Sequence, residues 1–434
     1  KEVFMTMGSI KEKIEGKEAR ISIIGAGYVG LPLAIAFCEE GFRVFSLDKD
    51  KEKVEKLRNG ISYVDDISNE EVKSAVDSGL LIPTNSDEVI AESDVVIITV
   101  PTPVTRNKEP DLTFIKEATH SITNHLHSPL LVSLESTTYP GTTEEILLPK
   151  FEERGFKVGE DIFLVFSPER INPGDKQHTL RTIPKIVGGI TPQCTEVGCF
   201  LYSQIIKEVI PVSNARTAEM IKLYENAFRY INIAFANEMA IICRRLGIDI
   251  WEVIRGAESK NFGFQAFYPG PGVGGHCIPV DPHYLRWHLK SLGHNELLLE
   301  VADSINMGMP FKIIEFLTEI LNEQGKPLKG SKVYILGITY KKDVADLRES
   351  PAIKLMELLK EKKAEVAYFD PFISHLPNFK QLNEESLSWA DVVLLVTDHS
   401  SFNYQWIADN CDCIFDTRDA FRGVKNSRAK IYKL

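Results

Sequence analysis

The stretch RISIIGAGYVGLPLAIAFCEEGFRVFSLDKD, residues 20–50, decides the fold of the N-terminal half. The apolar run ISII predicts a buried strand that leads into a turn carrying Gly25, Gly27 and Gly30. An apolar helix and a second strand follow, and the second strand ends at Asp48. The glycine spacing alone is weak evidence. The full order of strand, glycine turn, helix, strand and acid is the fingerprint of a dinucleotide-binding βαβ unit.

The residue types in this turn indicate which dinucleotide it would take. Glycines let the backbone approach a pyrophosphate at the N-terminus of the helix. Asp48 would accept hydrogen bonds from an adenosine ribose, and its charge disfavours a 2′-phosphate, so the sequence predicts NAD rather than NADP. A glycine-rich turn in an ordinary βαβ unit is the weaker alternative, because the complete fingerprint is present.

Length and composition place the chain among soluble globular proteins. It has 434 residues, of which 44% are hydrophobic and 26% charged, which predicts two or three domains. The formal net charge of -11 argues against nonspecific binding to nucleic acid or to an anionic membrane. No apolar run reaches membrane-spanning length. Residues 1–17 are charged and lack the apolar core of a signal peptide, so we expect a flexible lead-in there.

The seven cysteines form an odd, scattered set that is unlike a disulfide framework. A reducing cytoplasm is therefore the predicted location. Cys411 and Cys413 are two residues apart without a second pair of metal-ligand type, so no metal site is predicted.

Three further apolar strands each end in a polar loop. They lie in SDVVIITVPTP (93–103), PLLVSLESTTYPGTT (129–143) and DIFLVFSPERINPGD (161–175). Open parallel sheets bind ligands beyond the carboxyl ends of their strands. The candidates at these positions are Thr102, Thr137, Glu169 and Arg170. Each of them taken singly is equally explained by turn chemistry.

Residues 215–247 predict one long helix, because they contain no proline and no internal glycine before Gly247. The helix is apolar almost all round, which indicates burial between domains or between subunits. We therefore expect a homodimer, with a wholly intramolecular interface as the alternative. Lys222 and Asn226 share one face of this helix. A lysine in an apolar helix needs a partner or a function, and a salt bridge to Glu219 or Glu225 is the structural alternative.

The C-terminal part repeats the logic of the N-terminal half. A second long helix at about 295–322 and a linker, GKPLKG (325–330), precede a strand ending at Gly337 and another ending at Asp370. The glycine fingerprint is missing there, and the loop offers cations instead: Lys341, Lys342 and Arg348. This predicts a different phosphate-bearing ligand, with a solvated charged loop as the alternative. The fold class is α/β, with two Rossmann-type doubly wound parallel-sheet domains joined by a central helical region.

The segment GPGVGGHCIPVDP, residues 270–282, places Cys277 in a loop of four glycines and three prolines. Such a loop is free of bulk and could surround a diphosphate with backbone amides. A single cysteine is ordinarily a small buried hydrophobe. In this setting a reactive thiol is the better interpretation.

Together these motifs resemble the UDP-sugar 6-dehydrogenases, which oxidise a sugar C6 alcohol to a uronic acid with two NAD. The resemblance covers nearly all of residues 20–434 and rests on GAGYVGLPLA, VPTP, STTYPGTT, SPERINPG, EMIKLYENAFRYINIAFANE, GPGVGGHCIPVDP and LGITYKKDVADLRESPA, in the order of the family. Arg170 and Pro173, where the UDP-glucose branch has phenylalanine and a second glutamate, resemble the N-acetylhexosamine branch. UDP-N-acetylglucosamine 6-dehydrogenases look most similar. UDP-N-acetylmannosamine and UDP-N-acetylgalactosamine enzymes are the alternatives.

The resemblance implies a role for individual residues. The implied catalytic residues are Cys277, Lys222, Asn226, Asp281, Glu169 and Thr137. The implied NAD-binding residues are Gly25, Gly27, Tyr28, Val29, Gly30, Asp48, Lys53, Thr102, Thr137 and Arg348. The implied substrate-binding residues are Glu169, Arg170, Lys222, Asn226, Tyr268, Gly270, Gly274 and Lys341. The absence of a second glutamate at Pro173 leaves open which carboxylate serves the hydrolysis step.

The expected organisation is a lead-in (1–17), an NAD domain (18–212), a central helical and dimerisation domain (213–324) and a UDP domain (325–434), with the active site in the cleft between the two α/β halves. The implied role is the supply of an acidic amino sugar for surface polysaccharide. A β-hydroxyacid or 6-phosphogluconate type of dehydrogenase shares the Rossmann domain, the long helix and the Lys/Asn pair, but needs neither Cys277 nor a second Rossmann half. A non-catalytic nucleotide-sugar sensor would need a missing catalytic group, and none is missing.

Overall fold

The computed structural model describes residues 2–64, 66–105, 109–171, 178–275 and 278–434, with the backbone alone for 2–5. They form two compact units, Lys1–Glu225 with His283–Leu292 and Asn226–Pro282 with Gly293–Leu434. Cys277 and Pro173 lie outside the described residues.

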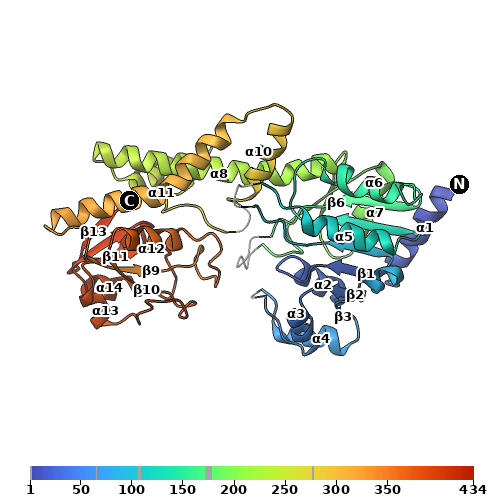
Figure 1. Cartoon of the computed structure of the whole chain (residues 1–434), viewed down its shortest axis with the longest axis horizontal. Helices are drawn as coiled ribbons and strands as arrows, with labels where there is room; N and C mark the ends of the chain where they lie inside the picture. Colours follow the sequence, from blue (N-terminus) through green and yellow to red (C-terminus); the bar gives the residue numbers. More distant parts are fainter. Residues whose placement is uncertain (1, 65, 106–108, 172–177, 276–277) are drawn as a thin grey trace. The chain divides into compact units, whose positions relative to one another are not determined.

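The first unit is built on an eight-stranded sheet with the order β3-β2-β1-β4-β5-β6-β7-β8 (Figure 1). Its strands are β1 (Arg20–Ile24), β2 (Arg43–Leu47), β3 (Leu81–Thr84), β4 (Val95–Ile98), β5 (Leu130–Leu134), β6 (Ile162–Phe166), β7 (Lys185–Gly189) and β8 (Val209–Pro211). Neighbouring strands run parallel from β3 to β6, whereas β7 is antiparallel to β6 and β8 is parallel to β7. The carboxyl ends of β1, β2, β4, β5 and β6 therefore share one edge, as the sequence predicts.

Helices on both faces bury the strands of this sheet. They are α2 (Gly30–Glu39), α3 (Lys51–Arg58), α4 (Asn69–Asp77), η1 (Asp87–Glu92), α5 (Thr113–Asn124), η2 (Thr143–Leu147), α6 (Leu148–Glu152) and α7 (Pro192–Tyr202). Successive residues of β1 point to opposite faces, so Ile23 belongs to one apolar cluster and Ile24 to the other. Burial on both faces explains why these strands are continuous apolar runs.

The N-terminal segment differs from the flexible lead-in that we expected. Residues Glu2–Glu15 form the helix α1. Ile10 and Ile14 are four residues apart, share one helical face and are fully buried in the core. Lys13 donates a hydrogen bond of 2.6 Å to Asp94. The charged residues between the two isoleucines lie on the other faces of the helix and obscured this pattern.

The two long helices of the sequence prediction are both present. The first, α8 (Ala215–Leu246), ends at Gly247, whose positive φ of 70° suits the residue that follows a helix. The second, α11 (Leu297–Glu323), contains Pro310. Between them lie α9 (Ile250–Glu258) and α10 (Asp281–Ser291).

The second unit contains a five-stranded parallel sheet with the order β10-β9-β11-β12-β13. Its elements are β9 (Lys332–Leu336), α12 (Pro351–Glu361), β10 (Glu365–Phe369), α13 (Glu384–Trp389), β11 (Val392–Leu395), α14 (Tyr404–Asp409), β12 (Cys413–Asp416), η3 (Ala420–Gly423) and β13 (Lys430–Lys433). The predicted second Rossmann-type half is confirmed.

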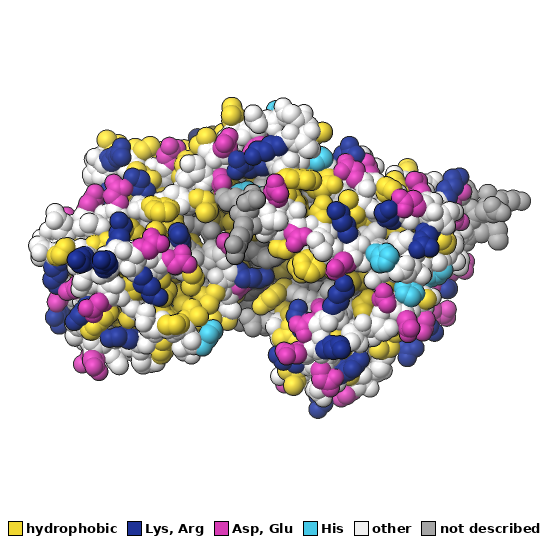
Figure 2. Space-filling view, in the orientation of Figure 1, with side chains coloured by type: hydrophobic (Ala, Val, Ile, Leu, Met, Phe, Trp, Pro, Cys, Tyr) yellow, Lys and Arg dark blue, Asp and Glu magenta, His cyan; other side chains and the backbone are white. Residues whose placement is uncertain are grey.

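Acidic and basic side chains are interspersed on the visible faces of both units (Figure 2). Within the described part of the chain, no helix combines the length and the apolar character needed to cross a membrane. The same residues hold no cluster of three or more His, Cys, Asp or Glu side chains suited to a metal ion.

Candidate functional site

The glycine turn after β1 has the geometry of a dinucleotide site. Gly25 has a positive φ of 102°, and a Cβ atom there would lie 2.7 Å from the carbonyl oxygen of Thr99. A Cβ at Gly30 would lie 1.8 Å from the oxygen of Gly25, so the start of α2 needs a glycine. A Cβ at Gly27 would meet no heavy atom within 4 Å, so the turn leaves open space where a phosphate group could approach.

Asp48 follows β2 and is tied to this turn. One carboxylate oxygen accepts the amide of Ala26 at 2.9 Å, and the other accepts the amide of Asp50 at 2.9 Å. Lys53, on α3, has its ammonium 3.9 Å from Asp48. These residues fit NAD: the glycines make room for its pyrophosphate, and Asp48 can still accept hydrogen bonds from a ribose. Of the other residues implied for NAD, Tyr28 is exposed, Val29 is half-buried and Thr102 is buried.

Glu169 follows β6 and has two lysines close to it. Its Oε1 atom accepts the amides of Arg170 and Ile171, both at 2.6 Å. Its Oε2 atom is buried and has no hydrogen-bond partner. The ammonium of Lys222, on α8, donates to the carbonyl oxygen of Glu169 at 2.6 Å. The structure therefore brings Lys222 into contact with the main chain of Glu169.

Lys222 does not form the salt bridge to Glu219 or Glu225 that was the structural alternative, because both of these carboxylates have other partners. Glu225 pairs with Arg170, whose Nη2 atom lies 2.5 Å from Oε1. Glu219 accepts hydrogen bonds from Gly141 and Thr143, in the turn after Thr137. Burial raises the pKa of Glu219 to about 7 despite these hydrogen bonds.

Sequence reasoning missed a buried ion pair beside Glu169. The ammonium of Lys185 lies 2.6 Å from Glu135 and 3.7 Å from Glu169. Tyr202 donates a hydrogen bond to the other oxygen of Glu135. The sequence feature that could have predicted this ion pair is a charged residue next to each of two apolar strands. Lys185 lies at the start of β7, and Glu135 lies just after β5. Burying them requires that they be paired.

In the second unit, Asn226 on α8 donates a hydrogen bond from Nδ2 to the carboxylate of Asp281 at the start of α10. Asn226 is 6% exposed and Asp281 is 3% exposed. Asn226 follows Lys222 by one helical turn, and Asp281 follows Cys277 by four residues. Two of the predicted catalytic residues are thus in direct contact.

The glycines before Cys277 are required by close packing. Gly270 donates its amide to the side chain of Asn237 at 2.9 Å, and a Cβ there would lie 2.5 Å from the guanidinium of Arg418. Gly274 would place a Cβ 2.7 Å from Tyr340. Tyr268 is half exposed, and its hydroxyl lies 3.3 Å from Glu258.

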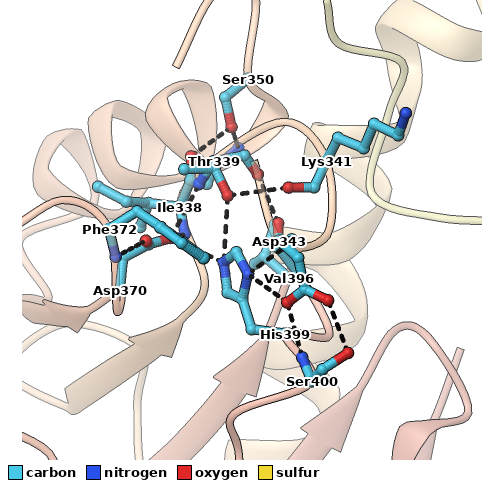
Figure 3. A network of polar contacts seen from close by, with 12 residues as sticks. Ile338, Thr339, Lys341, Asp343, Ser350, Asp370, Phe372, Val396, His399 and Ser400 are labelled. Carbon is cyan, nitrogen blue, oxygen red and sulfur yellow. Dashed lines mark hydrogen bonds and ion pairs between the residues drawn. The ribbon is translucent and has the colours of Figure 1, made fainter. Parts of the chain in front are cut away.

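The loop after β9 carries the predicted cations. Arg348 makes a bidentate ion pair with Asp346, with distances of 3.1 Å from Nε to Oδ1 and 2.6 Å from Nη2 to Oδ2. Lys341 accepts a hydrogen bond at its carbonyl from Thr339 (Figure 3). Lys342 lies 3.7 Å from Asp398. Lys341 and Arg348 thus lie on one loop of the second unit.

Three family models match successive parts of the chain. The NAD binding, central and UDP binding domains of the UDP-glucose/GDP-mannose dehydrogenase family match residues 19–206, 216–308 and 334–423. The chain belongs to this family. It is an NAD-dependent UDP-sugar dehydrogenase, an oxidoreductase.

Among individual relatives, the chain is 36% identical to UDP-N-acetyl-D-glucosamine 6-dehydrogenase of Pseudomonas aeruginosa, over 89% of this chain and 92% of the relative. It is also 36% identical to UDP-N-acetyl-D-mannosamine dehydrogenase of Escherichia coli K12, over 88% and 94% of the two chains. The solved structure of a UDP-D-ManNAc dehydrogenase from Pyrococcus horikoshii is similar with a TM-score of 0.87 and 31% identity, over 95% and 98% of the two chains.

Proposed function

We propose that this enzyme oxidises the C6 hydroxyl of UDP-N-acetylglucosamine to a carboxylate, which yields UDP-N-acetylglucosaminuronate. The reaction removes four electrons as two hydrides. NAD, held by the glycine turn and Asp48, would supply the hydride acceptor for each of the two oxidations. The observation that carries this proposal is the buried hydrogen bond between Asn226 and Asp281. It links the helix that carries Lys222 to the segment that carries Cys277.

Cys277 is the proposed nucleophile, because a free aldehyde does not readily give up a second hydride. Its thiolate adds to the aldehyde carbon, and the resulting oxyanion takes a proton to give a thiohemiacetal. Oxidation of that adduct gives a thioester. Water then adds to the thioester carbonyl, and the sulfur leaves as the thiolate, so the carboxylate product is released and Cys277 is regenerated.

The supporting residues have distinct proposed tasks. Lys222 and Asn226 stabilise the oxyanion, and the positive charge of Lys222 favours the thiolate form of Cys277. Glu169 and Asp281 order and deprotonate the hydrolytic water, and Thr137 lies near the C6 hydroxyl. The residues proposed to bind the remainder of the substrate are Arg170, Tyr268, Gly270, Gly274 and Lys341, and those proposed to assist NAD binding are Lys53, Thr102 and Arg348.

The test counts the NADH released per sugar consumed, for the wild type and for Cys277→Ser. We expect two NADH per UDP-N-acetylglucosamine and no second oxidation in the variant. Cys199→Ser is the matched control, because Cys199 is a half-buried thiol on α7 without a proposed role. A yield of one NADH per sugar that the substitution Cys277→Ser does not change would overturn the mechanism and favour a two-electron dehydrogenase.

UDP-N-acetylmannosamine is the second candidate substrate, because relatives named for either sugar match this chain at 36% identity. The same NADH assay, run with each UDP-sugar separately, distinguishes the two substrates. UDP-N-acetylgalactosamine is tested in it as a third candidate. Turnover with the mannosamine sugar alone would keep the mechanism and replace the substrate.

We further propose a homodimer, a cytoplasmic location and a role in supplying surface polysaccharide precursors. An apolar stripe of α8 supports the dimer. It consists of the exposed residues Met220, Tyr224, Phe228, Phe235, Ile242 and Leu246. Six described cysteines are free thiols, as a reducing compartment would keep them. The division into an NAD domain (18–212), a central domain (213–324) and a UDP domain (325–434) is part of the same proposal.

A further inference from the structure

The sheet of the second unit repeats the dinucleotide turn of the first unit. Gly337 follows β9 with a positive φ of 77°, as Gly25 follows β1. Asp370 follows β10 and accepts the amides of Ile338 and Thr339 at 2.7 and 3.1 Å. In the first unit Asp48 accepts the amide of Ala26 in the corresponding way. Asp370 thus has the position of an acid that would accept hydrogen bonds from a ribose.

In the second unit, however, a histidine of the chain itself binds this acid (Figure 3). The Nε2 atom of His399 lies 3.0 Å from Oδ2 of Asp370. His399 is fully buried, and the ring of Phe372 lies 5.2 Å from the imidazole. Both carboxylate oxygens of Asp370 thus have hydrogen-bond partners within the chain, His399 among them.

The hydrogen bonds of His399 indicate which ring nitrogen carries the proton in the neutral ring. The main-chain amide of Asp343 donates to Nδ1 at 3.0 Å. An amide N–H can only donate, so Nδ1 carries no proton. The proton of the neutral ring is then on Nε2, which donates to Asp370. Thr339 Oγ1 lies 3.1 Å from the same Nε2 atom and donates to the carbonyl of Lys341.

His399 and its neighbour therefore hold the loop 339–349 at its tip. Asp343 has a positive φ of 57°, in the left-handed region that aspartate adopts more readily than most non-glycine residues. Its carboxylate accepts the amide and the hydroxyl of Ser400 at 2.8 and 2.6 Å. This loop carries Lys341 and Arg348.

The other side of this loop supports the glycines that precede Cys277. The amide of Gly275 donates to the carbonyl of Arg348 at 3.0 Å. A Cβ at Gly275 would lie 2.8 Å from the ring of Tyr340, and one at Gly274 would lie 2.8 Å from the carbonyl of Glu349. A shift of the loop would therefore displace the glycine segment as well.

We propose that neutral His399 is a positioning residue that fixes the loop 339–349 and, through it, the glycine segment leading to Cys277. The proposal rests on the proposed function in one respect, the role of Cys277 as the nucleophile. His399 itself is fully buried and acts through the loop.

Protonation of His399 would remove the bond from the Asp343 amide, since both atoms would then be donors. The charged and titratable groups near the ring are Asp370 after β10, the Asp343 carboxylate at 3.6 Å, and the ion pair of Lys342 with Asp398. The hydroxyl of Tyr404 donates to the His399 carbonyl at 2.9 Å. The loop is thus expected to hold its position when the ring is neutral and to lose it when the ring is protonated.

Two substitutions separate the two hydrogen bonds. His399→Asn places an amide oxygen near the Nδ1 position, so it can accept from Asp343 and cannot be protonated. In His399→Gln the side-chain amide lies near the Nε2 position. It can still donate to Asp370, but the bond from the Asp343 amide is lost. We expect His399→Gln to raise the KM for the UDP-sugar about tenfold, the effect of one lost hydrogen bond, and to change the alkylation rate of Cys277 by iodoacetamide.

His399→Asn should retain a KM near that of the wild type at pH 8. Between pH 8 and pH 5.5 its KM should rise less than that of the wild type. His294→Asn, at an exposed histidine of the same unit, is the control and should follow the wild type. A wild-type KM and alkylation rate in His399→Gln would overturn the proposal, as would identical pH profiles of the wild type and His399→Asn.

Hydrogen exchange of the wild type provides a measurement that does not depend on the variants folding. Protection of residues 339–349, corrected for intrinsic exchange, should fall as the pH is lowered toward 5.5, and unchanged protection would overturn the proposal. If the wild type oxidises no UDP-sugar, the proposed function fails. Hydrogen exchange and the binding of UDP measured by calorimetry then still decide the role of His399.

Discussion

The ammonium of Lys185 lies 2.6 Å from a carboxylate oxygen of Glu135, and both side chains are buried. The same ammonium lies 3.7 Å from Glu169, so one cation serves two carboxylates. Burial lowers the pKa of Lys185, but the two carboxylates more than offset this effect and hold its pKa above the ordinary value. Lys185 therefore remains charged between the two carboxylates.

Removing this cation should destabilise the first unit. Lys185→Met leaves Glu135 buried without a counter-ion, and we expect a loss of about 3–5 kcal/mol in the free energy of unfolding. The double variant Lys185→Met/Glu135→Leu removes both charges and should recover most of the loss. Urea denaturation followed by circular dichroism measures both. Equal stabilities of the single and the double variant would contradict this account of the pair.

Lys222 should affect the rate of reaction more than the binding of NAD. Lys222→Met removes the proposed oxyanion donor together with its bond to the Glu169 carbonyl. We expect kcat to fall by about 10²–10³-fold, the range for the loss of one such donor, with the Kd for NAD unchanged. Lys150→Met, at an exposed lysine paired with Glu153, is the control. A decrease confined to KM would argue against an oxyanion role.

Asp48 should determine the choice of cofactor. Asp48→Asn removes the charge that would bind the ribose hydroxyls and repel a 2′-phosphate. We expect NAD affinity to fall about tenfold and the preference for NAD over NADP to narrow. Asp50→Asn removes a charge two residues away but keeps a side chain able to cap α3, so its preference should match the wild type. Fluorescence titration with both cofactors measures the two affinities.

The sequence was sufficient to predict the elements whose signals are local. The dinucleotide turn, the long helix α8 and the parallel sheet of the second unit follow from glycine spacing and apolar periodicity. The pairing of Asn226 with Asp281 depends on how residues 55 positions apart come together. The family resemblance implied that both residues are catalytic, but it did not predict their contact.

Other features could not be predicted because they depend on long-range packing. The bonds of His399 to Asp343 and Asp370 form only when three strand ends of one sheet align, so no local pattern in the sequence predicts them. The reversal of β7 relative to β6 is likewise a property of the assembled sheet. Helix α1 was missed because charged residues separate Ile10 from Ile14, the two fully buried side chains among its described residues.

Asp370 should make the stability of the second unit depend on pH. Burial raises the pKa of its carboxyl, but hydrogen bonds from His399 and from main-chain amides outweigh burial and hold the pKa below its usual value. The folded state then binds the proton more weakly than the unfolded chain. The contribution to stability is present above the unfolded pKa of about 3.9 and is lost as the pH falls through the lower folded value.

Accordingly, Asp370→Asn should destabilise the second unit at pH 7, and the difference from the wild type should shrink as the pH falls below about 4. Urea denaturation at a series of pH values measures this difference. Asp412→Asn, at an exposed aspartate of the same unit, should show little effect at any pH. A constant difference from pH 7 to pH 3 would contradict the assigned pKa shift.

The apolar stripe of α8 should mediate the proposed dimer. Tyr224 is 68% exposed and Phe235 is 58% exposed, although large apolar side chains on a helix are ordinarily buried. Tyr224→Glu would place a charge in the proposed interface. Because an isologous interface is formed by the same surface of both subunits, the charge would be introduced twice. We expect sedimentation velocity to show a dimer for the wild type and a monomer for the variant. Ile61→Glu, at an exposed apolar residue of the first unit outside α8, should remain dimeric. A wild type that is monomeric at micromolar concentration would mean that these side chains serve another purpose.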